Sequence, residues 1–170
     1  PAGSRYRRGM TRIGFGYDSH RFAPGRPLVL GGVHIDHPEG LAGHSDADAA
    51  CHAVIDALLG AAALGDIGEH FPPSDGQWKD ADSAGLLAVC LQRVGQAGWQ
   101  VGNCDLTVIA ERPRLGAYKP AMRRRLAELL GVDPSAVSVK AKTNEQMGFI
   151  GRGEGLAALA AVTLEPTKTP

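Results

Sequence analysis

The chain has 170 residues, of which 44% are hydrophobic and 21% are charged, and this composition suits one compact domain with a substantial core. Its 18 basic and 18 acidic side chains balance, so no broad positive field exists to attract nucleic acid. No apolar run approaches the roughly 20 residues that a membrane-spanning helix needs. We therefore expect a single domain that binds neither nucleic acid nor a membrane.

The three cysteines lie far apart in the sequence and form no C-x-x-C pair. This pattern is typical of reduced thiols, which favours a cytoplasmic protein over a disulfide-bonded secreted one. The basic opening lacks the apolar stretch of a signal peptide. We expect an extension over residues 1–9, one catalytic domain over residues 10–165 and a loose tail over residues 166–170.

In the first half of the chain, residues 12–20 and residues 28–35 are short and apolar, and each segment predicts one strand. Strong helix formers from Asp46 to Leu64 then predict the clearest helix. A second helix is expected over residues 83–96, with Asp82 as its N-cap and Gly98 just past its end.

In the second half, residues 100–110 predict a strand and residues 120–131 predict a helix that opens with a proline and closes at a glycine. Two last strands are expected over residues 137–143 and 156–165, with a glycine-rich segment between them. Strands mixed with three helices predict an α+β fold whose helices cover one face of a sheet. The apolar last strand favours an oligomer in which sheets pack together.

The triplet Asp18-Ser19-His20 lies at the end of the first predicted strand. Side chains alternate along a strand, so Asp18 and His20 point the same way while Ser19 points opposite. One carboxylate and one imidazole therefore converge. Taken alone, the triplet fits a polar strand end with a structural histidine better than it fits a functional site.

The segment "GHSDADAACH" over residues 43–52 introduces the first helix. If Ser45 caps that helix, Asp48, His52 and Asp56 follow one another along one face. His52 could then join Asp18 and His20 in a set of one oxygen and two nitrogen ligands, which suits a tetrahedral zinc with an open fourth position. The alternative for His52 is a half-buried structural histidine.

The same helix start predicts an anion site, because free backbone N–H groups and the positive end of the helix dipole lie beside His44 and Ser45. The alternative for Ser45 is a simple N-cap, and the two roles are compatible. Asp46 and Asp48 are expected to be carboxylates of the first turn that support the metal ligands without binding the metal.

The segment "KAKTNEQMGFIGRGEG" over residues 140–155 matches neither of the standard nucleotide-binding glycine motifs. A glycine-rich turn between strands is therefore the alternative to any functional interpretation. Even so, Lys142 and Thr143 could donate to a phosphate, and Glu145 could bind a hard cation such as magnesium.

Together these residues resemble the 2-C-methyl-D-erythritol 2,4-cyclodiphosphate synthase family over about residues 12–164. The resemblance implies a metal-dependent lyase that converts 4-diphosphocytidyl-2-C-methyl-D-erythritol 2-phosphate to the 2,4-cyclodiphosphate with release of CMP, on the non-mevalonate route to isoprenoids. It also implies a homotrimer with active sites between subunits. Several motifs in the family's order carry it: "GFGYDSHRF", "LGGVHI", "GLAGHSDADAACHAVIDALLGAAALGDIGEHFP", "DLTVIAERPRL" and "VKAKTNEQMGFIGRGEG".

The resemblance assigns roles to individual positions. It implies zinc, or another divalent transition metal, on Asp18, His20 and His52, and magnesium or manganese on Glu145. His44 and Thr143 match positions that stabilise the transition state. Substrate-binding positions are implied at Ser45, Asp66, Ile67, Gly68, Phe71, Asp75, Ala110, Lys142, Asn144, Phe149 and Arg152, within the matched segments 66–68, 71–75, 110–116 and 142–145.

Two departures from the family pattern concern the substrate contacts. Pro73 replaces an aspartate of some relatives, and residues 142–144 read "KTN" where some have a threonine run. Arg152 and Glu154, near Tyr17, also resemble residues around a cavity on the trimer axis that can hold a prenyl diphosphate. Two other functions fit the spacing: a zinc phosphoesterase, and a trimeric module that binds prenyl diphosphates with a purely structural metal.

Overall fold

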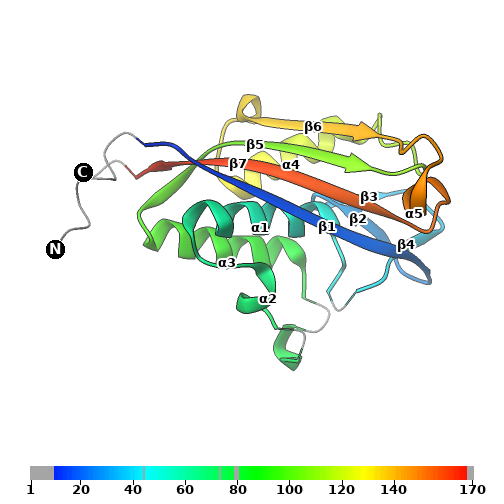
Figure 1. Ribbon diagram of the computed structural model, residues 1–170, viewed down its shortest axis with the longest axis horizontal. Coiled ribbons are helices and arrows are strands. Elements are labelled where there is room, and N and C mark those ends of the chain that lie inside the picture. Colours follow the sequence, from blue (N-terminus) through cyan, green and yellow to red (C-terminus); the bar gives the residue numbers. More distant parts are fainter. Residues whose placement is uncertain (1–9, 44, 73, 79–80, 168–170) are drawn as a thin grey trace.

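A five-stranded mixed sheet forms the frame of the molecule (Figure 1), in a computed structural model that describes residues 10–43, 45–72, 74–78 and 81–167. The strand order is β4-β1-β7-β5-β6, and every neighbouring pair is antiparallel except β5 and β6, which are parallel. A small hairpin of two further strands lies beside it. The bounds are β1 Arg12–Pro24, β2 Leu28–Leu30, β3 Val33–Ile35, β4 Glu39–Leu41, β5 Trp99–Ile109, β6 Val137–Lys142 and β7 Gly155–Pro166.

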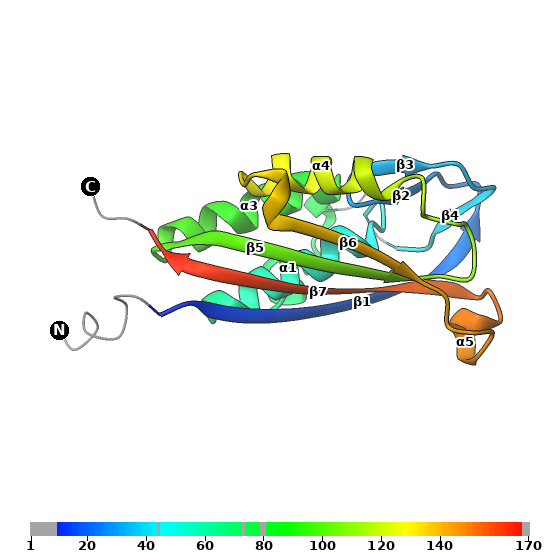
Figure 2. The same cartoon turned by 90° about the horizontal axis from the view of Figure 1, so that it is seen from above.

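The three long helices lie on one side of the sheet, and Figure 2 shows the opposite side of β1 and β7 without a covering helix. α1 packs against β1 and β7, α3 packs against α1 and β5, and α4 covers β6. The predicted α+β fold with helices on one face is therefore confirmed. The bounds are α1 Ala49–Ala62, α3 Ser83–Gln96 and α4 Lys119–Leu130, with short turns α2 Ile67–His70, η1 Gly76–Trp78, η2 Pro134–Ala136 and α5 Gly148–Gly151.

α1 lies directly on β1 because two glycines of the strand allow the backbones to meet. A Cβ added at Gly14 would lie 1.8 Å from the carbonyl oxygen of Ala57, and one at Gly16 would lie 1.9 Å from that of Ala53. Both atoms belong to the helix backbone, so no side-chain movement could relieve either contact. The glycines therefore fix the position of α1 relative to β1.

Most predicted elements are confirmed, including α3 with its Asp82 cap and α4 with its proline start and glycine end. The single strand expected over residues 28–35 is wrong, because Gly31 and Gly32 have positive φ and turn the segment into the β2–β3 hairpin. Short elements β4, α2 and α5 were not predicted. β7 runs to Pro166, so the predicted tail begins inside a strand, while residues 1–9 and 168–170 lie outside the described part.

The start of α1 also differs from the prediction. The helix begins at Ala49, and its N-cap is Asp48, whose carboxylate accepts the backbone N–H of Cys51 at 3.0 Å. Ser45 is not the cap, although its hydroxyl oxygen accepts the N–H of Ala47 at 3.1 Å. The carboxylate of Asp48 also accepts N–H groups from the β2–β3 turn at 2.8 and 2.7 Å, so it holds this turn and the helix start together instead of supporting the predicted metal ligands.

The outer face of the sheet carries exposed apolar side chains on β1. Ile13 is 75% exposed, Phe15 64% and Tyr17 50%. β7 adds Leu159 and Ala161 beside them, through the pairs Tyr17↔Leu159 and Phe15↔Ala161. An apolar stripe of this kind is typical of a surface that another molecule covers. None of the helices in the described part of the chain combines the length and apolar character needed to cross a bilayer.

Candidate functional site

Three side chains from β1 and α1 converge where the strand passes the start of the helix. Asp18 Oδ2 lies 2.8 Å from His20 Nε2 and 3.0 Å from His52 Nδ1, and the two histidine nitrogens are 3.3 Å apart. The side chains are 25%, 19% and 12% exposed, respectively. The predicted convergence of Asp18, His20 and His52 is therefore confirmed, and these three form the one candidate metal-binding cluster among the described residues.

The geometry and chemistry of this cluster fit a divalent transition metal. In a tetrahedral site with bonds of about 2.1 Å, ligand atoms lie about 3.4 Å apart. The observed separations of 2.8 to 3.3 Å need only a small expansion to reach that value. The outer nitrogen of His20 already lies 2.7 Å from the carbonyl oxygen of Ala42, which leaves Nε2 free to bind a metal.

Without a metal, the cluster is held together by hydrogen bonds that shift two pKa values in opposite directions. Burial raises the pKa of Asp18, but hydrogen bonds with His20 and His52 outweigh burial and leave that pKa below its ordinary value. Burial lowers the pKa of His20, but the Asp18 carboxylate outweighs burial and leaves that pKa raised. The ligands are therefore gathered by mutual attraction before any metal binds.

A cavity of about 280 Å³ lies beside the cluster. Its wall includes His20 and His52, so a molecule in the cavity would touch the metal-binding side chains. Five predicted substrate residues also line the cavity: Ser45, Ile67, Gly68, Phe71 and Asp75. Trp78 and Leu86 complete its apolar part, and Trp78 packs edge-on against Phe71 with ring centroids 4.9 Å apart.

Two residues that the sequence analysis placed with the substrate or the metal ligands do not line this cavity, Asp66 and Asp56. Asp66 is exposed and caps α2, where its carboxylate accepts the N–H of Glu69 at 3.0 Å. Asp56, which the helix spacing aligned with His52, accepts the N–H of Ile67 at 2.8 Å and so ties α2 to α1. His44 and Pro73 lie outside the described residues, so the predicted role of His44 stays a prediction.

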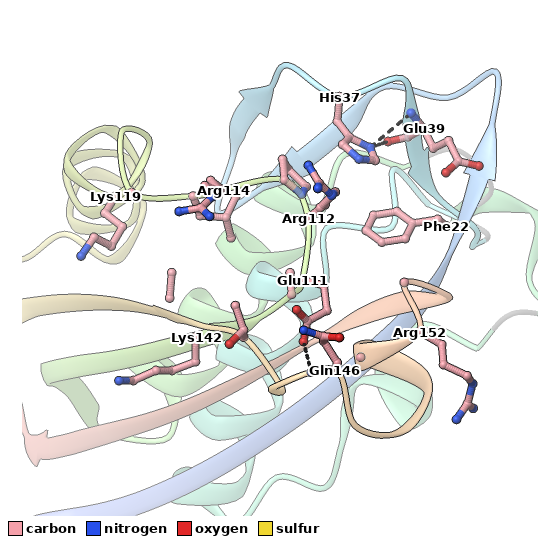
Figure 3. Close-up of a pocket in the computed structure, with 18 residues that line it drawn as sticks. Phe22, His37, Glu39, Glu111, Arg112, Arg114, Lys119, Lys142, Gln146 and Arg152 are labelled. Carbon is pink, nitrogen blue, oxygen red and sulfur yellow. Dashed lines mark hydrogen bonds between the residues drawn. The ribbon is translucent and has the colours of Figure 1, made fainter.

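A second, larger cavity of about 890 Å³ lies at the end of β5 and β6 (Figure 3). Its lining brings together predicted residues 110–116 with Lys142, Thr143 and Arg152. In Figure 3 the side chain of Arg152 extends away from the centre, and its Nε donates to Glu154 at 2.7 Å. Cationic side chains outnumber acidic ones around the cavity: Arg112, Arg114, Lys119, Lys142 and Arg152 against Glu39 and Glu111. This charge suits a phosphate-bearing ligand.

Glu111 organises one wall of the larger cavity. Its Oε1 accepts the backbone N–H of Asn144 at 2.9 Å and that of Gln146 at 3.0 Å. These bonds hold the loop after β6, where Glu145 and Gln146 both have positive φ. The carboxylate therefore fixes the turn that carries the predicted magnesium ligand.

The remaining predicted residues lie next to the larger cavity but do not line it. The Glu145 carboxylate is exposed and accepts the hydroxyl of Thr143 at 2.8 Å. The Asn144 side chain donates to the carbonyl oxygen of Met147 at 2.8 Å, and Phe149 is 41% exposed. No residue is shared between the linings of the two cavities, so the metal cluster and the cationic pocket are separate sites within the described part of one chain.

Several lining residues were not singled out from the sequence. Phe22, His37 and Lys119 reach the larger cavity from β1, the β3–β4 loop and α4, which are distant in sequence. Trp78 and Leu86 reach the smaller cavity in the same way. In the sequence, the one feature that could have drawn attention to Trp78 is that the chain has only two tryptophans.

Known proteins resemble this chain in sequence and in fold. The model of the YgbB family matches residues 11–165. A 2-C-methyl-D-erythritol 2,4-cyclodiphosphate synthase of Symbiobacterium thermophilum is 60% identical over 89% of this chain and 97% of its own length. One of Xanthomonas axonopodis pv. citri is 57% identical over 94% of this chain and 96% of its own.

A solved structure of 2C-methyl-D-erythritol-2,4-cyclodiphosphate synthase in its CDP-bound form is also similar, with a TM-score of 0.84 and 38% identity. It covers 91% of this chain and 100% of its own. The residues matched by the family model, 11–165, include the strands and helices that carry the metal cluster and the cationic pocket. The chain therefore belongs to the YgbB family.

Proposed function

We propose that the chain is a 2-C-methyl-D-erythritol 2,4-cyclodiphosphate synthase, which converts 4-diphosphocytidyl-2-C-methyl-D-erythritol 2-phosphate to the cyclic diphosphate and CMP. The observation that carries this function is the Asp18–His20–His52 cluster in the wall of a cavity lined by five predicted substrate residues. Its relatives of the same name share well over half of their aligned residues with it.

The reaction requires two negatively charged groups to meet. An oxygen of the 2-phosphate forms a bond to the β-phosphorus, and the bond from that phosphorus to the oxygen of CMP breaks. The attacking oxygen is already ionised and CMP leaves as a phosphate, so positioning and charge neutralisation matter more than proton transfer. A divalent metal on the cluster would supply Lewis acidity and positive charge at this point.

The chain's own groups supply the rest of the positioning. The Ser45 hydroxyl lines the smaller cavity, where it could donate to a phosphate oxygen. In the larger cavity, the Lys142 ammonium and the Thr143 hydroxyl could bind the diphosphate, with Arg112 and Arg114 adding positive charge. We also propose that His44 stabilises the transition state, as the resemblance implies.

We propose zinc at the Asp18–His20–His52 cluster and magnesium or manganese at Glu145. The donor set of one carboxylate oxygen and two imidazole nitrogens supports zinc at the cluster, since zinc readily takes such ligands with an open fourth position. The exposed carboxylate of Glu145, bonded to the Thr143 hydroxyl at the rim of the cationic pocket, supports a magnesium or manganese ion there.

We further propose a homotrimer with each active site between two subunits. Two observations support it: the exposed apolar stripe of Ile13, Phe15 and Tyr17, and the separation of the metal cluster from the cationic pocket within one chain. A Phe15→Glu variant should dissociate in sedimentation experiments and lose activity. A wild-type monomer with full activity would refute the proposal.

We also propose that the trimer can bind a prenyl diphosphate on its axis, and that the protein is cytoplasmic. The axial ligand is supported by the apolar stripe on β1, together with the pairing of Glu154 with Arg152 and Arg21 at the end of the sheet. The setting is supported by three free, buried cysteines.

The test of the main proposal is a mass-spectrometric assay of the products made from the 2-phosphate substrate, with and without a chelator. We expect the cyclic diphosphate and CMP in equal amounts, and loss of both with the chelator or with His52→Ala. Non-cyclic hydrolysis products would instead indicate a phosphoesterase. Prenyl diphosphate binding without any turnover, and unaffected by His20→Ala, would indicate a binding module.

A further inference from the structure

The imidazole of His52 has a second set of partners on the side facing away from Asp18. Its Nε2 lies 2.9 Å from the hydroxyl oxygen of Ser83 and 3.2 Å from that of Ser45. Ser83 is the first residue of α3 and is completely buried, so water cannot replace it as a partner. The nearer hydroxyl, Ser83, therefore dominates the environment of Nε2.

The direction of this hydrogen bond is set by a third residue. The hydroxyl of Ser83 donates to Oδ1 of Asp46, and its backbone N–H lies 3.2 Å from Oδ2 of the same carboxylate. A hydroxyl carries one proton, so the Ser83 hydroxyl that donates to Asp46 has none left to donate to His52. The Ser83 oxygen can then interact with His52 only as an acceptor. This favours a proton on Nε2, because a lone pair on Nε2 would face a lone pair of the nearer Ser83 oxygen.

This chain of bonds decides which nitrogen of His52 can bind a metal. When Nδ1 gives up the proton of its hydrogen bond with Asp18, a proton on Nε2 leaves a neutral imidazole whose lone pair is on Nδ1. Nδ1 is the atom that lies 3.0 Å from Asp18 and 3.3 Å from His20. The carboxylate of Asp46 thus selects the metal-binding form of a ring that it does not touch.

We propose that Asp46 and Ser83 are positioning residues for the metal site, and that they hold His52 in the tautomer and orientation in which Nδ1 faces Asp18 and His20. The inference rests on the metal site in the proposed function and adds two residues to it. His20 has the simpler equivalent, since its outer nitrogen bonds to the Ala42 carbonyl oxygen. In metal sites, loss of such an outer partner typically weakens metal binding 10- to 100-fold.

Ser83 also begins α3, so its role must be separated from helix stability. Asp82 provides the matched control, because its carboxylate caps α3 by accepting the N–H of Ala84 at 3.1 Å. An Asp82→Ala variant weakens the same helix end but leaves the hydrogen bonds from Ser83 to His52 and Asp46 in place.

The experiment measures the zinc dissociation constant of the full chain by competition with a chromophoric chelator, and the melting temperature without metal. We expect Ser83→Ala to raise the dissociation constant 10- to 100-fold. Asp82→Ala should lower the melting temperature but keep the dissociation constant within twofold of wild type. In ¹⁵N NMR of the zinc-loaded chain, the slowly exchanging Nε2–H of His52 should be visible in wild type and lost in Ser83→Ala.

Three outcomes would overturn the inference. Unchanged zinc affinity in Ser83→Ala would show that the hydroxyl does not position His52. Equal losses of zinc affinity in Ser83→Ala and Asp82→Ala would assign the effect to the helix end instead of the hydroxyl. Absence of zinc binding in the wild-type chain would refute the metal site itself, and the inference with it, whereas the first two results leave the proposed function intact.

Discussion

The contact between β1 and α1 can be tested by adding one methyl group to Gly16. The new Cβ would lie 1.9 Å from the carbonyl oxygen of Ala53 and 2.8 Å from the backbone nitrogen of Ala57. Real contacts of this kind are not shorter than about 3 Å, so the helix would have to retreat from the strand by about 1 Å. Because both partners are backbone atoms, the cost lies at the upper end of the range for overpacking, about 3 kcal/mol.

The same displacement acts on the metal site. Gly16 is two residues before Asp18 in the strand, and Ala53 directly follows His52 in the helix. A shift of about 1 Å exceeds the tolerance of about 0.2 Å on metal–ligand distances, so zinc affinity should fall as well. We expect Gly16→Ala to lower the melting temperature by about 6 to 12 °C and to weaken zinc binding at least tenfold.

Two alanine variants serve as controls in the same assay, which combines thermal melts with chelator competition. Gly14→Ala creates a similar overlap, with 1.8 Å to the Ala57 carbonyl oxygen, one helical turn further from His52. It should lose comparable stability but less zinc affinity. A Cβ at Gly60 has no atom within 4 Å, so Gly60→Ala should stabilise the helix by about 1 kcal/mol. Wild-type stability and zinc affinity in Gly16→Ala would refute the reasoning.

Three further predictions follow from the hydrogen bonds. The lowered pKa of Asp18 stabilises the metal-free fold above pH 3.8, and the raised pKa of His20 stabilises it below pH 6.5. In thermal melts with a chelator, the melting temperature should therefore fall as the pH rises above 6.5 and as it drops below 3.8. Asp18→Asn should flatten both slopes, because each shift depends on the Asp18 carboxylate. Glu111→Ala removes the acceptor of two backbone N–H groups beside the cationic pocket. If the chain has the proposed function, this variant should bind CDP about tenfold more weakly than wild type in calorimetry, whereas Glu111→Gln, which keeps an acceptor oxygen, should bind within threefold of wild type. Asp48→Ala removes the acceptor for three backbone N–H groups and should cost about 3 kcal/mol in urea unfolding; a loss below about 1 kcal/mol would contradict its role as the tie between α1 and the β2–β3 turn.

The sequence predicted the elements whose signals are local. α3 and α4 carry their own caps, and β5 and β7 are long apolar segments, so their bounds agree with the structure to within about one residue. The hairpin at residues 28–35 was missed because its two glycines were interpreted as strand residues, although both have positive φ. β4, α2 and α5 have three or four residues each, too few to show any periodicity.

The metal ligands were predictable for a different reason. Strand alternation alone places Asp18 and His20 on one face, and the glycines at positions 14 and 16 of the same face leave room for a helix to approach. The partner helix was identified by its sequence, but not its true start, because Ser45, Asp46 and Asp48 are all residues that favour a cap. The structure distinguishes them, because the Asp48 carboxylate accepts the N–H of Cys51 and also those of the β2–β3 turn.

Ser83 could not have been found from the sequence. It is 31 residues from His52, and as the first residue of α3 it looks like part of a helix start. Its role depends on α3 packing against α1, which no local pattern specifies. Residues that hydrogen-bond to a metal ligand without touching the metal are therefore harder to predict than the metal ligands themselves. They depend on a tertiary contact and belong to no sequence motif.

The structure suggests how the metal site reaches its geometry. Two ligands lie on β1 and the third on α1, and these elements meet backbone to backbone at two glycines, so no flexible side chain separates them. The ligand atoms already lie within 3.3 Å of one another without a metal, held by the Asp18 hydrogen bonds inside the cluster and by Ser83 and Ala42 outside it. Binding a metal then requires deprotonation and a movement of a few tenths of an ångström, instead of the folding of a loop. Such a site should bind its metal without any change in secondary structure, and its affinity should depend on the backbone contact and the outer hydrogen bonds as strongly as on the choice of ligands.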